Sequence, residues 1–266
     1  MLALIGGGAE TVELAAELAR QAPAECRHDL DAVRLFAPLP EPPQIRDFLC
    51  FEEHLKNSFA QAAKLTGEER EIPAVWYEQP IYYKANRFSV NGPETDVVWP
   101  SYSQLMDYEL ELACVIGTGG RDIAREDGAG HIFGFTIFND ASARDAQMLE
   151  MAGQLGPAKG KDFDTGNVFG PWIVTPDELG DPYALEMVAR VNGEEWSRGN
   201  SASMHHRFED LIAFVSRSET LHPGEILGSG TVGSGCGLEQ GRFLADGDVV
   251  ELEVEGIGVL RNRFVR

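Results

Sequence analysis

The chain has 266 residues, of which 43% are hydrophobic and 24% are charged, values typical of a globular protein built on one large domain. Its formal net charge of −21 repels phosphate backbones and anionic membranes, which argues against nucleic acid and membrane partners. No apolar run reaches the roughly 18 residues that span a bilayer, and no secretory signal pattern opens the chain, so we expect a cytoplasmic protein.

The first forty residues predict a small separate unit. An apolar run at 2–5, the glycines Gly6–Gly8 and a helical pattern over 10–20 predict a strand–turn–helix. The glycines are a poor dinucleotide fingerprint because Thr11 stands where a third glycine belongs, yet a nicotinamide oxidoreductase stays an alternative. Four prolines within 37–44 predict a stiff connector. We therefore expect an N-terminal subdomain with its connector over 1–44 and a catalytic domain over 45–266.

The rest of the chain predicts a strand-rich α+β domain. Residues 45–67 begin extended and become helical, and 72–83 are strand-like and aromatic. Short strands separated by glycine turns are predicted at 110–117, 132–139, 172–175, 186–192, 249–254 and 259–263, with helices at 143–152 and 207–216. The four cysteines lie far apart without a C-x-x-C pair, which predicts reduced, mostly buried thiols rather than a zinc ribbon.

Two glutamates alternate with leucines in the strand predicted near residue 110. Successive side chains of a strand point to opposite faces, so Glu109 and Glu111 share one face and form half of a site for a hard cation. The same E-x-E spacing recurs at Glu251 and Glu253, where it predicts the wet face of a half-buried strand. The spacing alone therefore does not identify a metal site.

A third carboxylate follows the apolar run 132–138. A strand that is apolar on both faces is buried, so Asp140 at its end needs a partner. If a helix begins there, Arg144 and Gln147 fall on the same face as Asp140, at positions i+4 and i+7. The three residues either form part of a site, or Asp140 caps the helix and pairs with Arg144.

Four blocks of sequence resemble, in order and spacing, the fumarylacetoacetate hydrolase family: YELELACVIG, GFTIFNDASARDAQ, LGPAKGKDFDTGNVFGPWIV and HPGEILGSGTVGSG. The resemblance covers about residues 45–266. It implies a mixed β-sandwich roll of the fumarylacetoacetate hydrolase C-terminal-domain type, with a small N-terminal appendage. Because members of the family are usually dimeric, it also implies a homodimer.

The resemblance implies a Mg²⁺ or Mn²⁺ site, with Ca²⁺ as a further candidate for oxygen ligands. Its metal ligands match Glu109, Glu111 and Asp140. Asp47 is similar to a fourth ligand, and His54, seven residues later, is similar to a general base.

Further positions follow from the same resemblance. Arg144, Gln147 and Lys161 match catalytic positions, although Lys159 competes with Lys161 because the segment before the lysine is one residue longer. Glu239 is the candidate that orients His54. The candidate substrate-binding residues are Tyr83, Lys84 and Thr231, the last followed by a valine where the family has proline.

The activity implied is hydrolysis of a carbon–carbon bond in acylpyruvates (2,4-dioxo acids) through a metal-bound enolate. Family alternatives are decarboxylation of a 2-oxo acid such as oxaloacetate, and isomerisation or hydration of a 2-oxo dienoate in aromatic catabolism. A non-catalytic binding protein with a degraded site is the alternative of another class.

Overall fold

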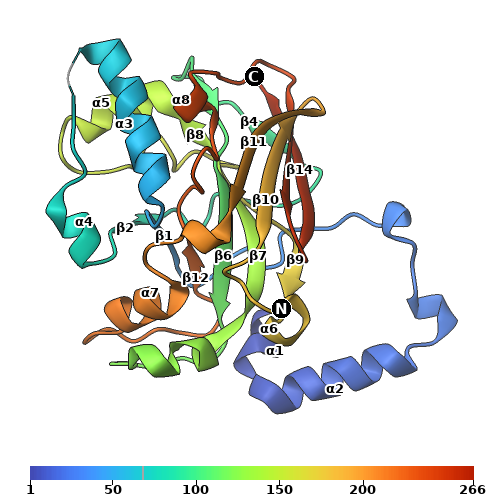
Figure 1. The fold of residues 1–266 in the computed structure, drawn as a ribbon. Helices are drawn as coiled ribbons and strands as arrows, with labels where there is room; N and C mark the ends of the chain where they lie inside the picture. The colour runs from blue at the N-terminus through green and yellow to red at the C-terminus, as the bar shows by residue number, and fades with distance from the viewer. Residues whose placement is uncertain (68) are drawn as a thin grey trace.

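The computed structural model describes residues 1–67 and 69–266, and these form three β-sheets (Figure 1). The seven-stranded sheet has the spatial order β2 (Tyr82–Ala85), β1 (Ile45–Phe48), β12 (Ile226–Gly228), β6 (Leu110–Ile116), β7 (Ile132–Asp140), β9 (Asn167–Val174) and β3 (Val90–Asn91). The five-stranded sheet has the order β11 (Glu194–Asn200), β10 (Glu186–Val191), β13 (Val249–Val254), β14 (Gly258–Val265) and β4 (Asp96–Val98). The short strands β5 (Met106–Asp107) and β8 (Ser142–Ala143) pair with each other.

Both large sheets mix parallel and antiparallel pairs, for example β1–β12 parallel and β12–β6 antiparallel. The α-helices are α1 (Leu2–Gly6), α2 (Gly8–Gln21), α3 (Glu52–Thr66), α4 (Ala74–Glu78), α5 (Arg144–Met151), α6 (Pro176–Leu179), α7 (Phe208–Val215) and α8 (Gly237–Gln240). Short 3-10 turns are η1 (Ala24–Cys26), η2 (Leu30–Ala32), η3 (Arg125–His131) and η4 (Ser201–Ser203). The predicted strand-rich α+β fold is confirmed.

Strand β6 is buried along its whole length, and it holds residues of the hydrophobic core as well as Glu111. Leu110 and Leu112 on one face belong to the main core, which also holds buried residues of β10 and β13 from the other large sheet. Ala113 and Val115 on the opposite face belong to a second cluster. A strand covered on both faces explains the nearly continuous apolar sequence.

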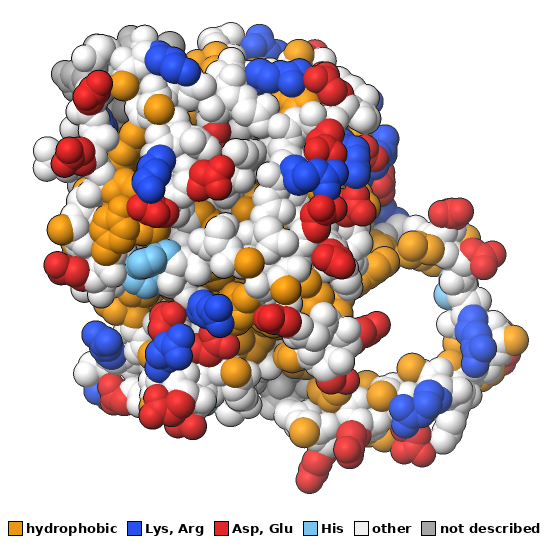
Figure 2. All heavy atoms as spheres, viewed as in Figure 1, with side chains coloured by type: hydrophobic (Ala, Val, Ile, Leu, Met, Phe, Trp, Pro, Cys, Tyr) orange, Lys and Arg blue, Asp and Glu red, His pale blue; other side chains and the backbone are white. Residues whose placement is uncertain are grey.

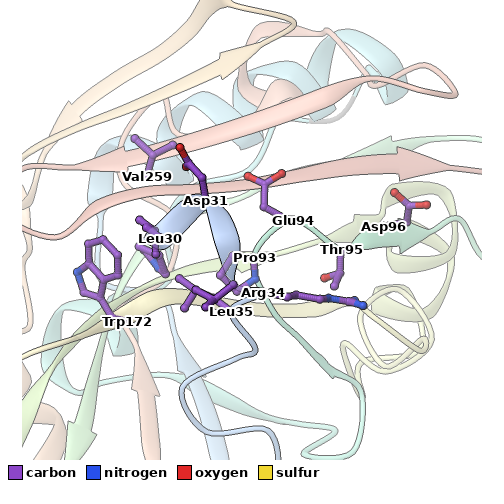
Figure 3. A pocket seen from close by; sticks show the side chains of 12 residues that line it. Leu30, Asp31, Arg34, Leu35, Pro93, Glu94, Thr95, Asp96, Trp172 and Val259 are labelled. Atoms are coloured by element: carbon purple, nitrogen blue, oxygen red, sulfur yellow. The ribbon is translucent and has the colours of Figure 1, made fainter. Parts of the chain in front are cut away.

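Helix α1 packs against the body through the buried Ile5, and the chain then leaves the body as an arm that begins with α2 (Figures 1 and 2). The strand predicted at 2–5 is wrong: these residues form helix α1, because a four-residue apolar run does not distinguish strand from helix. No strand therefore precedes Gly6–Gly8, which removes the structural context of a dinucleotide site. Helix α2 buries none of its residues. The arm returns to the body at Leu30–Leu35, beside a cavity of about 860 Å³ that Trp172 and Val259 also line (Figure 3).

Several sequence predictions are tested directly. The strand predicted over 72–83 is largely wrong, since the one-turn helix α4 begins directly after Pro73 and only the last two residues enter β2. Strand β13 alternates buried and half-buried positions, which confirms that its glutamates line a wet face. All four cysteines are free and three are buried, as predicted. In the described part of the chain, none of the helices has the length and apolar character needed to cross a membrane.

Candidate metal and catalytic site

Four buried carboxylates from three strands meet on one face of the seven-stranded sheet. Asp47 lies on β1, Glu109 immediately precedes β6, Glu111 is the second residue of β6, and Asp140 ends β7. One oxygen from each of the four lies within 4.8 Å of the others. Because β1, β12, β6 and β7 are consecutive neighbours, the pairing of the strands creates this row.

The residue at position 228 is a glycine, which leaves space for the side chains of Asp47 and Glu111 to approach each other. Gly228 on β12 pairs with Asp47 on one side and with Ala113 on the other, so it stands between Asp47 and Glu111. A Cβ atom at Gly228 would lie 2.4 Å from Asp47 Oδ1 and 3.0 Å from Glu111 Oε2. The two carboxylates converge because this residue has no side chain.

The residues fit a divalent cation. Glu111 Oε1 and Asp140 Oδ1 are buried and have no hydrogen-bond partner in the described structure, although buried polar atoms are normally paired. Burial raises the pKa of Glu111 well above its ordinary value, and repulsion from Asp47 adds to the rise. Burial likewise raises the pKa of Asp47, with a further contribution from Asp140. Four converging carboxylates, two of them with oxygens that lack a partner, are the kind of oxygen ligands that Mg²⁺ and Mn²⁺ prefer.

Two buried cations already neutralise part of the cluster. Lys161 Nζ donates to Glu109 Oε2 at 2.6 Å and to Asp140 Oδ2 at 2.5 Å. Arg144 lies 2.7 Å from Glu109 Oε1 and 2.8 Å from Asp107 Oδ2. Burial alone would raise the pKa of Glu109, but Arg144 and Lys161 together lower it. Glu109 is therefore ionised, whereas the raised pKa values of Asp47 and Glu111 favour their protonated forms until a cation stabilises the charged ones.

His54 and Glu239 form a hydrogen-bonded pair beside the cluster. His54 lies near the start of α3 and its Nδ1 is 2.8 Å from Glu239 Oε1 on α8. The other oxygen of Glu239 accepts from Asn57 Nδ2 at 2.9 Å and from the Ser234 backbone N–H at 2.7 Å. A carboxylate facing Nδ1 keeps the proton on that nitrogen and leaves Nε2 as the basic atom.

One cavity of about 450 Å³ joins these groups. Asp47, His54, Glu109, Arg144 and Lys161 line it, together with Tyr83, Gln147 and apolar side chains of α3, α4 and β2. The Tyr83 hydroxyl donates to Asp140 Oδ2 at 2.7 Å, and burial raises the pKa of Tyr83 well above its ordinary value. Gln147 accepts from Arg144 at 2.9 Å, which leaves its amide nitrogen available as a donor.

Three other sequence predictions differ from the structure. Asp140 belongs to β7 and α5 begins at Arg144, so the expected shared helical face is wrong and Arg144 pairs with Asp107 and Glu109. Lys84 is exposed and points away from the cavity, because it alternates with Tyr83 along β2 and lies 4.0 Å from Glu219.

Thr231 is buried and does not belong to the cavity-lining residues in the described structure. Instead the backbone N–H of Gly230 donates to Glu111 Oε2 at 3.1 Å. Lys161 is buried in the cluster, whereas Lys159 is exposed.

Asp107 is a site-supporting residue that the sequence analysis missed. It is fully buried and accepts from Arg144 Nε at 2.8 Å and from the backbone N–H of Gly237 at 2.8 Å. It thereby ties the arginine to α8, the helix that carries Glu239. The signal was present in the sequence, because Asp107 continues the alternation of Glu109 and Glu111 by one more step.

Comparison with known proteins agrees with this architecture. The family model for the C-terminal region of fumarylacetoacetate (FAA) hydrolase matches residues 44–265. The chain belongs to the fumarylacetoacetate hydrolase family, a family of enzymes, as the sequence blocks predicted.

Curated relatives carry the name oxaloacetate tautomerase. The mitochondrial human protein FAHD2A is 41% identical over 199 residues, which cover 74% of this chain and 62% of that protein. YisK of Bacillus subtilis is 33% identical over 241 residues, covering 89% of this chain and 75% of YisK. This chain thus spans somewhat less than two thirds of the length of the mitochondrial relative.

Solved structures of other activities have the same fold. Maleylpyruvate hydrolase from Sphingobium sp. SYK-6, in complex with manganese(II) and pyruvate, is 26% identical with a TM-score of 0.77, covering 100% of this chain and 85% of that one. The 5-carboxymethyl-2-hydroxymuconate delta-isomerase from Mycobacterium smegmatis is 30% identical with a TM-score of 0.73, covering 90% and 82%.

Proposed function

We propose that this protein is a Mg²⁺- or Mn²⁺-dependent enzyme that forms and reprotonates the enolates of 2-oxo acids. The observation that carries the proposal is the cluster of Asp47, Glu109, Glu111 and Asp140 beside the paired His54. A cation bound by these carboxylates would polarise the 2-oxo group of the substrate and favour the negative charge of its enolate. The manganese and pyruvate in the related hydrolase structure support this choice.

His54 is the proposed base. Its Nδ1 faces Glu239 Oε1 at 2.8 Å, so Nε2 is free to take a proton from the substrate or from water in the cavity. The amide nitrogen of Gln147 is the proposed donor to a substrate oxygen that gains negative charge. Lys161 has a different proposed role, which is to balance the charge of the cluster, because its ammonium group contacts Glu109 and Asp140.

The finer proposal is hydrolysis of acylpyruvates. His54 would take a proton from a water that attacks the 4-carbonyl carbon, and the bond between C3 and C4 would break. The products are a carboxylic acid and pyruvate, the latter formed as an enol that takes a proton at C3. The likeness to maleylpyruvate hydrolase supports this reading.

Tautomerisation is the second candidate, supported by the names of the curated relatives. It needs the same proton transfer at C3 but no attack by water. His54 would remove a proton from C3 of the keto form, and the oxygen on C2 would take a proton to give the enol. No bond between carbon atoms breaks.

One experiment separates these outcomes. Acetylpyruvate and oxaloacetate are incubated with the protein in Mg²⁺, in Mn²⁺ and in EDTA. Hydrolysis releases acetate and pyruvate in equal amounts, decarboxylation releases pyruvate from oxaloacetate, and tautomerisation changes only the ultraviolet absorbance of the enol. His54→Ala should abolish the reaction, whereas His28→Ala on the exposed arm should not. Full turnover in EDTA, or by His54→Ala, would refute the proposal.

The same experiment addresses the non-catalytic alternative, which predicts metal binding without turnover of any acid. The predicted homodimer, cytoplasmic location and division at residue 44 stay predictions. Sedimentation at several protein concentrations would measure the oligomeric state.

A further inference from the structure

We infer that the cavity selects 2-oxo acids whose group beyond the reacting carbon is apolar and discriminates against dicarboxylates. This inference rests on the proposed function, because it assumes that the carboxylate cluster holds the 2-oxo acid end of the substrate. It favours acylpyruvates with an apolar acyl group over oxaloacetate, which is itself a dicarboxylate. It concerns the opposite part of the same cavity, whose walls come from α3, α4, β2 and α5.

The charged side chains of the cavity are gathered at one end. Glu109 contacts both Arg144 and Lys161, at 2.7 and 2.6 Å, and shares the four-carboxylate cluster with Asp47. His54 lies beside them, held by Glu239. Apart from two tyrosines, the titratable residues among the described residues that line the cavity are these five: Asp47, His54, Glu109, Arg144 and Lys161.

The remaining wall is mainly apolar. Its apolar side chains include Leu55 and Phe59 of α3, Val75 and Trp76 of α4, Ile81 before β2 and Met151 of α5. The indole N–H of Trp76 donates to the Leu49 carbonyl at 2.6 Å, so this donor is already used. On the outer surface, Figure 2 shows hydrophobic side chains near α4.

Two cationic side chains line the cavity among the described residues, Arg144 and Lys161, and neither is free to bind a second substrate carboxylate. Arg144 is held between Asp107 and Glu109, and Lys161 is held between Glu109 and Asp140. The uncharged donors that line the cavity include Ser58, Tyr82 and Gln147, and without a positive charge they suit a carbonyl or hydroxyl oxygen better than a carboxylate. Burying an unpaired carboxylate against the apolar wall is unfavourable, whereas burying methylene groups there is favourable.

Binding by a series of 2-oxo acids tests this inference without requiring turnover. Dissociation constants are measured by calorimetry in Mg²⁺ for pyruvate, 2-oxobutanoate, 2-oxopentanoate, 2-oxohexanoate and phenylpyruvate, with 2-oxopentanedioate as the dicarboxylate. Affinity should rise roughly fourfold for each methylene added until the cavity is filled. The dicarboxylate should bind more weakly than 2-oxohexanoate, which is of similar size.

A charge placed in the wall should reverse this preference. Val75→Lys puts a cation at a position that is 44% exposed, so folding should tolerate it, and it should strengthen binding of 2-oxopentanedioate by roughly fivefold. The matched control is Val98→Lys on β4, which is 48% exposed and outside the cavity-lining set, and it should bind every acid as the wild type does.

The inference would be overturned if the wild type bound all acids of the series with the same affinity, or if it bound the dicarboxylate as tightly as 2-oxohexanoate. Its failure is distinct from failure of the proposed function. If affinity rises with chain length while no acid is turned over, the enzymatic proposal fails and the apolar selectivity stands. If acids are turned over but affinity ignores chain length, only the selectivity fails.

Discussion

The Nδ1 atom of His54 lies 2.8 Å from Oε1 of Glu239, although 185 residues separate them in the chain. Helices α3 and α8 hold the pair together through two more bonds: Asn57 donates to the Glu239 carboxylate at 2.9 Å and Gln61 donates to its backbone carbonyl at 2.9 Å. The carboxylate is thus fixed before a substrate arrives. This preorganisation gives the imidazole one tautomer and one orientation.

We expect Glu239→Gln to lower kcat roughly 100- to 10,000-fold, the usual contribution of general acid–base catalysis. A glutamine can donate to Nδ1 and so stabilise the tautomer in which Nε2 is no longer basic. KM and the melting-temperature gain caused by Mg²⁺ should stay near wild type, because Glu239 lies outside the four-carboxylate cluster. Glu253→Gln, which alters only a surface ion pair with Arg190, is the control. An unchanged kcat in Glu239→Gln would contradict the assigned tautomer.

Removing one of the proposed metal ligands should remove most of the increase in melting temperature that Mg²⁺ causes. Mg²⁺ at 100 times its dissociation constant should raise the melting temperature of the wild type by roughly 5–10 °C. Glu111→Gln should lose most of this gain and should melt higher than the wild type in EDTA, because the mutual repulsion of Glu111 and Asp47 disappears. Thermal unfolding with Mg²⁺ and with EDTA measures both effects. Glu253→Gln carries the same change on the wet face of β13 and should keep the full gain.

The two candidate lysines should behave differently. Lys161→Met leaves Glu109 and Asp140 without their buried cation, which should cost about 3 kcal/mol or roughly 6–12 °C in EDTA. Mg²⁺ should recover part of this loss by supplying positive charge. Lys159→Met changes an exposed residue and should have little effect in the same unfolding experiment. Equal losses in both variants would mean that Lys161 does not balance the cluster.

The response to metal should also depend on pH. Asp47 and Glu111 have raised pKa values in the metal-free fold, chiefly because of burial, so the folded protein holds protons that the unfolded chain has released. Stability in EDTA should therefore fall as pH rises from about 4 through the raised pKa values. The lowered pKa of Glu109 acts in the opposite sense, but only below the ordinary range of a carboxyl group.

Because a cation competes with these protons, the gain in melting temperature caused by Mg²⁺ should grow over the same pH window. Unfolding curves in EDTA and in Mg²⁺ from about pH 5 to about pH 8 measure both trends. In Glu111→Gln the dependence should become weaker. A gain that is the same at every pH would show that the cluster is already ionised without metal.

Local chemistry in the sequence was enough to predict much of this protein. The alternation around Glu109 and Glu111 is a property of one strand, and the apolar run before Asp140 predicted a buried strand with a carboxylate at its end. The resemblance to a family supplied the sheet architecture and the pairing of His54 with Glu239. Two segments were the failures: residues 2–5 are too few for periodicity to separate strand from helix, and residues 72–83 contain a short helix after Pro73 before β2 begins.

Only the tertiary structure decided how these residues meet. The order β1–β12–β6–β7 places Asp47 beside Glu111, and Gly228 makes room for them from a strand more than a hundred residues further along the chain. The same packing turns Arg144 toward Asp107 rather than Asp140 and selects Lys161 over Lys159. Strand alternation is set by bonds within a few residues, whereas strand neighbours are set by pairing and burial across the whole chain, which a single strand's sequence does not encode.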